Sequence, residues 1–202
     1  MAKIPAKIIT LLFHPMIMPT LGIFIILNSG TYISTIHSDA QKFIYLIVFA
    51  CTFIFPLLFF PFLLYRNLVT SFSIHNHKER IYPLILALIF YLIAYYVIQS
   101  LPFPSIFSSF LLACLISLSV VLIISIFWKI SIHMCGIGGI IGLLLSISIN
   151  FLTNLQFYLI IAFIIAGLTA YSRLKLNEHN YQQVVAGFSI GFVVVFLTVL
   201  FF

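Results

Sequence analysis

Residues 106–128 are IFSSFLLACLISLSVVLIISIFW, a run of 23 residues without a charged side chain. A helix needs about 20 mainly apolar residues to cross the hydrocarbon core of a bilayer. The run lacks the regular alternation of apolar and polar residues that is typical of a membrane β-barrel strand. Because a bilayer offers no water to unpaired backbone groups, such a run must satisfy its own hydrogen bonds. It therefore predicts a membrane-spanning α-helix.

Further apolar runs of similar length lie on both sides of this stretch. Turn-forming residues separate them, among them Pro102, Pro104 and the segment 150–154. The third and fifth runs are short for a span, so the prediction is an all-α, multi-pass transmembrane bundle of six to seven spans. No repeat or linker divides the chain, and we treat residues 1–202 as a single integral membrane domain. The other runs are 9–29, 42–65, 83–99, 134–150, 155–171 and 183–202.

The composition excludes several other classes of protein. Of the 202 residues, 64% are hydrophobic and only 6% are charged, which excludes a soluble globular domain. Seven spans would use roughly 140 residues, which leaves no room for a second soluble domain. The net charge of +6 is explained by basic loops at a membrane face, so we expect a lipid bilayer and no nucleic acid as partner. The three cysteines show neither a disulfide framework nor zinc spacing, and we expect no metal and no cofactor.

The basic residues are distributed unevenly between the two faces. If all seven runs cross the membrane, only Lys42 lies near one face. The positive-inside rule makes the crowded face cytoplasmic. We therefore predict a protein of the cell membrane with its N-terminus on the cytoplasmic side and its C-terminus on the outer side. The eight bases of the crowded face are Lys3, Lys7, Arg66, Lys78, Arg80, Lys129, Arg173 and Lys175.

Three clusters of reactive side chains fall on this same crowded face. Two spans separate each cluster from the next, and an even number of crossings returns the chain to the same side. Placing ionisable residues close to a membrane core costs free energy, so their presence there indicates a functional site. The clusters are His75, His77, Lys78, Glu79 and Arg80; Lys129, Ser131 and His133; and Ser172, Arg173, Lys175, Glu178 and His179.

Residues 172–187, SRLKLNEHNYQQVVAG, resemble a known motif. They are similar to the third signature of the type 2 phosphatidic acid phosphatase superfamily, which is Ser-Arg, five residues, His, three residues, Asp. Ser172, Arg173 and His179 match in spacing, whereas Gln183 stands where the family has Asp.

Two other segments extend this resemblance. Residues 130–133, ISIH, resemble the second signature, Pro-Ser-Gly-His, and keep Ser131 and His133. A two-span hairpin lies between the second and third signatures, as in the family. Arg80 and Pro83, with two residues inserted between them, resemble the Arg-Pro of the first signature, and Lys78 would replace its lysine.

The resemblance implies a metal-independent hydrolase that acts on a membrane lipid phosphate or isoprenyl diphosphate. His179 would attack phosphorus to form a phosphohistidine, and His133 would protonate the leaving alkoxide. Gln183 would orient His179 but brings no negative charge. The phosphate would be held by Arg173, Ser131, Arg80 and Lys78.

Two alternatives to a phosphatase stay open. A non-catalytic relative would bind or translocate a lipid phosphate through the same basic pocket. A small transporter would use Arg173 and His179 in a proton or anion path. His14 lies at a predicted membrane boundary and receives no role. The glycine pairs 138/142 and 187/191 predict close contacts between helices.

Overall fold

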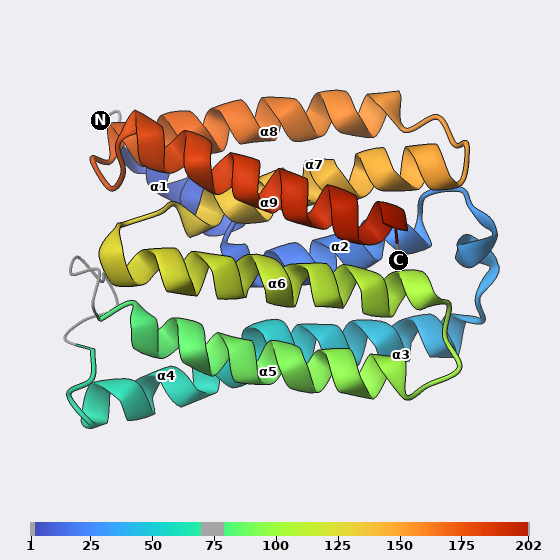
Figure 1. The fold of residues 1–202 in the computed structure, drawn as a ribbon, viewed down its shortest axis with the longest axis horizontal. Coiled ribbons are helices and arrows are strands. Elements are labelled where there is room, and N and C mark those ends of the chain that lie inside the picture. Colours follow the sequence, from blue (N-terminus) through green and yellow to red (C-terminus); the bar gives the residue numbers. More distant parts are fainter. Residues whose placement is uncertain (1–2, 70–78, 202) are drawn as a thin grey trace.

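The computed structural model describes residues 3–69 and 79–201, and these contain helices and connecting loops but no strand. The longer helices lie side by side in a bundle, roughly along one common direction (Figure 1). The helices are α1 (Lys3–Leu12), α2 (Met18–Leu27), α3 (Ser38–Phe49), α4 (Phe55–Tyr65), α5 (Ile81–Gln99), α6 (Ser105–Phe127), α7 (Ile132–Asn150), α8 (Gln156–Lys175) and α9 (Tyr181–Phe201). Two short 3₁₀ helices, η1 (Pro15–Ile17) and η2 (Tyr32–Thr35), and a π-helical turn, η3 (Ala50–Ile54), connect some of them.

Seven segments of this bundle are long and apolar enough to cross a membrane. This confirms the predicted all-α, multi-pass membrane architecture, and it shows that the runs at 83–99 and 134–150 are also long enough to span. The segments are Ile4–Leu27, Ser38–Tyr65, Ile81–Gln99, Ser105–Phe127, Ile132–Asn150, Gln156–Lys175 and Tyr181–Phe201.

The first span is not one continuous helix. α1 ends at Leu12, His14 is extended with ψ of 136°, and Pro15 begins η1 before α2 starts. Proline disfavours helical backbone at the residue before it, so Pro15 explains why the helix stops at this point. The break places His14 inside the length of the first span.

The second span contains a local irregularity of a different kind. In η3 the N–H of Phe55 donates to the carbonyl oxygen of Ala50, five residues earlier, and Pro56 follows directly. Because proline has no N–H, the usual helical bond to Thr52 cannot form, and a π-turn fits the chain to this loss. The irregularity adjoins the cavity described below.

α7 is the central helix of the bundle. In its apolar window 67% of the residues are buried, against at most 33% in any other span. It packs most closely on α9, where small residues allow the two backbones to touch. A Cβ atom at Gly138 would overlap the carbonyl oxygen of Phe188, and a Cβ atom at Gly191 would overlap that of Cys135. The close helix contacts predicted from the paired glycines are confirmed.

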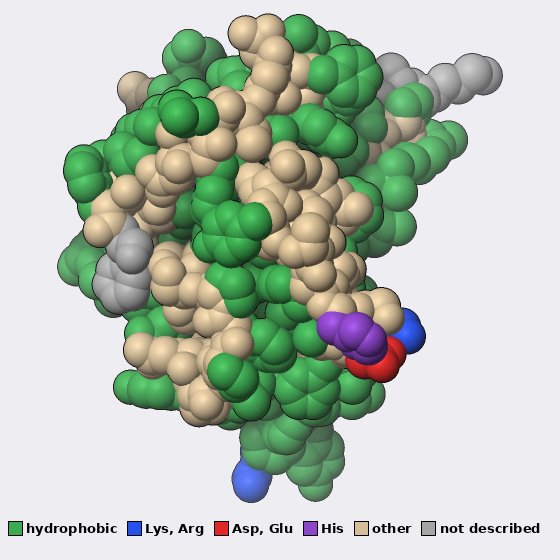
Figure 2. All heavy atoms as spheres, turned by 90° about the vertical axis from the view of Figure 1, so that its right-hand side faces the viewer, with side chains coloured by type: hydrophobic (Ala, Val, Ile, Leu, Met, Phe, Trp, Pro, Cys, Tyr) green, Lys and Arg blue, Asp and Glu red, His purple; other side chains and the backbone are tan. Residues whose placement is uncertain are grey.

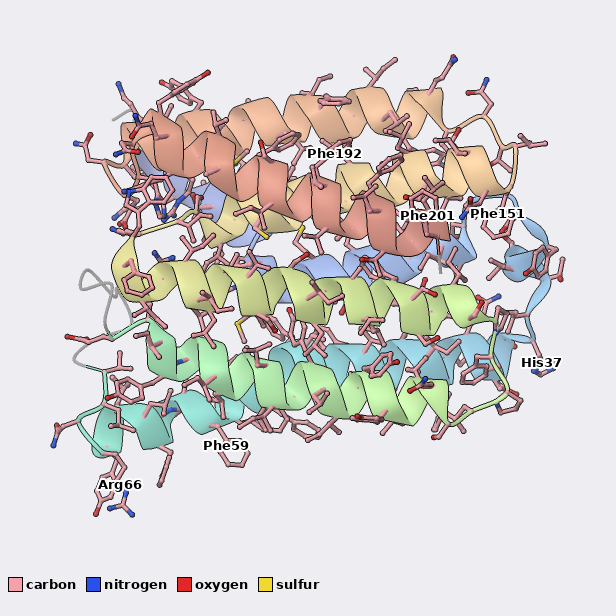
Figure 3. All side chains as sticks on the ribbon, in the orientation of Figure 1. His37, Phe59, Arg66, Phe151, Phe192 and Phe201 are labelled. Atoms are coloured by element: carbon pink, nitrogen blue, oxygen red, sulfur yellow. The ribbon has the colours of Figure 1, made fainter. Side chains whose placement is uncertain are left out.

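The bundle has two unlike ends. The N-terminus, the end of α4, the start of α5 and the connections α6–α7 and α8–α9 lie at the left in Figure 1, and the connections α2–α3, α5–α6 and α7–α8 lie at the right. We call the left-hand end, with Lys7, Arg66, Arg80, Lys129 and Lys175, the basic end. Arg66 is labelled there in Figure 3, at the opposite end from His37.

The opposite end is largely hydrophobic or neutral. Figure 2 looks at it directly and shows a compact group of acidic, basic and histidine side chains on this surface. At this end the Lys42 ammonium lies 3.0 Å and His37 Nδ1 3.7 Å from carboxylate oxygens of Asp39. The contrast between the ends agrees with the uneven distribution of bases along the sequence.

Candidate functional site

The three sequence clusters meet at the basic end, as far as they are described. The N–H of Ser131, which precedes α7, donates to the carbonyl oxygen of Gln183 in α9 at 3.2 Å. Arg80 Nη1, just before α5, donates to the carbonyl oxygen of Ile130 at 3.2 Å. These two bonds connect segments that are far apart in the sequence. Lys78, His75 and His77, which belong to the first cluster, lie outside the described residues.

His179 forms the hydrogen bond expected with Gln183. Its Nδ1 lies 2.9 Å from Oε1 of Gln183. The same Oε1 accepts the backbone N–H of Asn180 at 3.3 Å, while Oδ1 of Asn180 accepts the N–H of Gln183 at 2.9 Å. This reciprocal pair is a capping box at the start of α9, which explains locally why a polar Asn and Gln occur there.

The capping box also determines the tautomer of His179. A backbone N–H can only donate, so the Gln183 atom facing Asn180 must be the amide oxygen, not the amide nitrogen. That oxygen can only accept from His179, and therefore Nδ1 carries the proton. In the neutral ring Nε2 is then left with its lone pair, as a nucleophile or a hydrogen-bond acceptor.

The surroundings of His179 keep its ring neutral. Burial lowers its pKa to about 3; the bond to Gln183 acts in the opposite direction, and Arg173, Arg80 and Lys129 lower the pKa further. A neutral imidazole among three cations offers a lone pair in a region of positive potential. The three cations attract an anion to this region, while the unprotonated ring keeps its lone pair available.

Arg173 lies in the last turn of α8 and is buried. Its Nη2 is 3.8 Å from Oε2 of Glu178, and Lys129 Nζ lies at the same distance from that oxygen. Both pairs are long, and Nε of Arg173 has no hydrogen-bond partner among the described residues. One carboxylate therefore compensates two bases only in part, and the site keeps a net positive charge.

Two other cations at the site are also affected by burial. Burial, with repulsion from Arg173, lowers the pKa of Arg80 to about 10, although Glu178 acts in the opposite direction. Burial also lowers the pKa of Lys129, again opposed by Glu178. With a pKa of about 10, Arg80 remains charged at neutral pH. A nearby anion would stabilise these charges, because its attraction offsets the cost of burying them.

Ser131 and His133 lie where α7 begins. Ser131 occupies the N-cap position, but its Oγ makes no capping bond and is buried without a hydrogen-bond partner among the described residues. Nε2 of His133 is also buried without a hydrogen-bond partner among the described residues. The His133 ring hydrogen-bonds the backbone of Thr10. A buried polar group without a partner costs about 1–3 kcal/mol. The unpartnered Ser131 hydroxyl at a helix N-terminus suits an anionic ligand, because it can donate a hydrogen bond.

His14 also belongs to this end, although no role was predicted for it from the sequence. Its ring packs against His133 in a T-shaped contact, with ring centroids 5.5 Å apart and an interplanar angle of 84°. The helix break at Pro15 brings it there. The Phe-His-Pro sequence at 13–15 is the only local signal that could have indicated it, because a proline inside an apolar run predicts an interruption of the helix.

An elongated cavity of about 360 Å³ opens at the basic end. This volume lies at the lower end of the range of small-molecule sites, about 300–1,000 Å³. Its lining along α5 runs from Arg80 to Tyr91, about 16 Å at 1.5 Å per residue. At the basic end it is lined by His14, Arg80, His133 and Arg173, and farther in by Leu86, Tyr91, Phe110, Cys114, Ile140 and Val195. The cavity is therefore amphipathic, with a basic opening and a mainly apolar interior.

The predicted site residues divide into two groups around Arg173. Arg80, His133 and Arg173 line the cavity, whereas Ser131, His179 and Gln183 are not among its described lining residues. Arg173 acts electrostatically on both His133 and His179, so the two groups are neighbours. Within residues 3–69 and 79–201, no three His, Cys, Asp or Glu side chains form a group that could hold a metal ion.

Comparison with protein-family models, with curated proteins and with solved structures gives no match to this chain.

Proposed function

We propose that this protein is a lipid phosphatase-like membrane protein that hydrolyses a lipid phosphate or diphosphate through a phosphohistidine intermediate. The observation that carries this proposal is the amphipathic cavity, whose basic opening adjoins a neutral histidine. An amphiphile with an anionic head and an apolar tail is complementary to such a cavity. The spacing of Ser172, Arg173 and His179, which resembles the third phosphatase signature, supports the same chemistry.

The head group would be held by positive charge and hydrogen-bond donors. A phosphoryl group in transfer spreads negative charge over its oxygens. The guanidinium groups of Arg173 and Arg80 suit these oxygens, because each offers several donors in a planar fork. The unpartnered hydroxyl of Ser131 would supply one more donor. The tail would occupy the apolar interior.

The first chemical step would use the lone pair of His179. Nε2 attacks phosphorus, a P–N bond forms, and the P–O bond to the lipid breaks. His133 gives a proton to the departing oxygen, so the lipid leaves as an alcohol, or as a monophosphate when the substrate is a diphosphate. Gln183 holds the Nδ1 proton and so fixes the direction of Nε2.

The second step would release inorganic phosphate. Water attacks the phosphohistidine, the P–N bond breaks, and His133, now neutral, accepts a proton from the water. His179 returns to its starting form. The cycle consumes one water molecule and needs neither an oxidant nor a metal ion.

A non-catalytic protein that binds or translocates a lipid phosphate is the second candidate. Two observations favour it: Gln183 brings no negative charge to stabilise a phosphorylated imidazolium, and His179 is not among the described residues lining the cavity. In that case Arg80, His133 and Arg173 would bind the head group without transferring it.

The proposal is tested with purified protein in a neutral detergent. Inorganic phosphate release is measured from phosphatidic acid, phosphatidylglycerophosphate and isoprenyl diphosphate. We expect release from at least one of them, loss of release in His179→Ala, and an acid-labile phosphate on His179 by mass spectrometry. His37→Ala is the matched control, because His37 is exposed at the opposite end.

Two results would contradict the catalytic proposal. Equal release by the parent and His179→Ala would mean that His179 is not the nucleophile. Binding of the lipid phosphates without any release would favour the non-catalytic candidate.

A further inference from the structure

His14 comes from the N-terminal span, outside the three clusters that suggested the site. It lies between α1 and η1, with the extended backbone that Pro15 requires. It is half-buried and lines the basic opening of the cavity. The first span therefore contributes a polar side chain to a site whose other predicted members come from later in the chain.

The hydrogen bonding of His14 determines which of its nitrogens faces a ligand as a donor. Nδ1 accepts the backbone N–H of Met16 at 3.4 Å and caps η1. A nitrogen that accepts carries no proton, so in the neutral ring the proton is on Nε2. His14 is thus the reverse of His179, whose Nδ1 carries the proton.

The neighbours of this N–H offer it few acceptors. The ring packs edge to face with His133, and the Arg173 guanidinium acts on it electrostatically. Among the described residues that line the cavity there is no Asp or Glu. An acceptor for His14 Nε2–H at this opening is therefore best supplied by the ligand.

We propose that His14 is a phosphate-binding residue, whose Nε2–H donates a hydrogen bond to an oxygen of the lipid phosphate that Arg173 holds. This inference rests on the proposed function only in assuming that the site binds a lipid phosphate, not that it hydrolyses one. A neutral N–H adds a donor without placing another positive charge beside Arg173 and Arg80. It also fixes the first span to the head group.

The test uses dodecylphosphonate, whose C–P bond does not react in the proposed mechanism. Its binding is measured by calorimetry on the full chain in a neutral detergent. His14→Asn keeps an oxygen that can cap η1 but removes the donor at the Nε2 position. His14→Gln places an amide N–H near the Nε2 position instead.

We expect His14→Asn to weaken dodecylphosphonate binding about tenfold or more, the effect of losing a hydrogen bond to a charged group. His14→Gln should recover part of this loss. His37→Asn is the matched control, because Nδ1 of His37 caps α3 in the same way, accepting from Asp39 N–H at 3.4 Å. It should bind like the parent. Binding of uncharged 1-dodecanol should be equal in all four proteins, which shows that the apolar cavity is intact.

The outcomes separate this inference from the proposed enzyme activity. Equal phosphonate affinity of the parent and His14→Asn overturns the role of His14, whatever the activity. A loss confined to the phosphonate supports it, even when no lipid phosphate is hydrolysed and the phosphatase proposal fails. Equal losses for phosphonate and dodecanol overturn it, because His14 would then act on the shape of the cavity. A parent that binds no phosphonate overturns both proposals.

Discussion

Gln183 has two structural roles through a single oxygen atom. It closes the capping box with Asn180 and it accepts the Nδ1 proton of His179. The first role alone explains a Gln at this position, because Gln and Glu are the usual capping-box residues at the third position of a helix. The second role connects the start of α9 to the candidate nucleophile. A Glu would retain both bonds and add the negative charge that the family pattern has at this position.

We therefore expect Gln183→Glu to raise the pKa of His179 from about 3 by about one unit or more. The sign follows from the charge, because a carboxylate stabilises the protonated imidazole and the neutral amide does not. Histidine-selective NMR titration measures the shift. If the protein is a phosphatase, phosphate release should rise several-fold, since the same charge stabilises the imidazolium formed on attack. Gln183→Asp should give a smaller gain, because its carboxylate is one methylene shorter.

Gln182→Glu is the matched control for this prediction. It adds the same charge in the same helical turn, but Gln182 is exposed and has no bond to His179. Equal pKa shifts in the two variants would mean that the effect is general electrostatics. No change in release with Gln183→Glu, in a protein that His179→Ala inactivates, would mean that Gln183 is not the orienting partner.

At the scale of helices, the contact between α7 and α9 holds the start of α7, with Ser131 and His133, beside the start of α9. Gly187 is the residue of this contact closest to the site, because a Cβ atom there would overlap the carbonyl oxygen of Ser131. Ser131 in turn donates its N–H to the carbonyl oxygen of Gln183. The absence of a side chain at Gly187 is thus required for the geometry at the start of α7.

Gly187→Ala should separate these segments and destabilise the bundle by about 1–3 kcal/mol, the usual cost of overpacking. Thermal unfolding in detergent measures the change as a lower midpoint. Gly167→Ala in α8 is the matched control, because a Cβ atom there meets no other atom within 4 Å. It should be neutral or slightly stabilising, since alanine favours a helix by about 1 kcal/mol over glycine. An equal midpoint for both variants would contradict the role of the α7–α9 contact.

The helices themselves were largely predictable from the sequence. Hydropathy gives the spans because the bilayer requires a minimum apolar length, and the paired glycines indicate close contacts because small residues let two backbones approach each other. In the sequence, only Pro15 indicated the interruption near His14. Its consequence, contact with His133, was not predictable, because it depends on how the first span packs in three dimensions.

The candidate site was predictable only in part, for a similar reason. The parity of crossings brings Arg80, Ser131 and Arg173 to one end whatever the packing. The bond between His179 and Gln183 is local, and a spacing of four residues is enough to suggest it. The cavity, in contrast, is formed by residues that are far apart in the sequence. Its walls come from helices along the chain, and no sequence pattern states which apolar faces leave a space between them.

At the scale of the whole molecule, we predict that the basic end faces the cytoplasm. The sequence places eight bases on this side and one on the other, and basic loops are retained inside. In a variant without the native cysteines, Lys42→Cys should react with a membrane-impermeant maleimide in intact cells. Lys175→Cys, at the basic end, should react only after the membrane is permeabilised. The reverse labelling pattern would place the site on the outer face.

The backbone contact between α7 and α9 has a mechanical consequence. Two helices that touch through glycines cannot slide or rotate past each other without steric overlap, so the segments with Ser131, His133, His179 and Gln183 behave as one stiff unit. We therefore expect any widening of the cavity to involve the first span, which is interrupted at Pro15 and lines the cavity there. A distance measured spectroscopically between labels at this interruption and in α8 should vary. The distance between labels in α7 and α9 should stay constant.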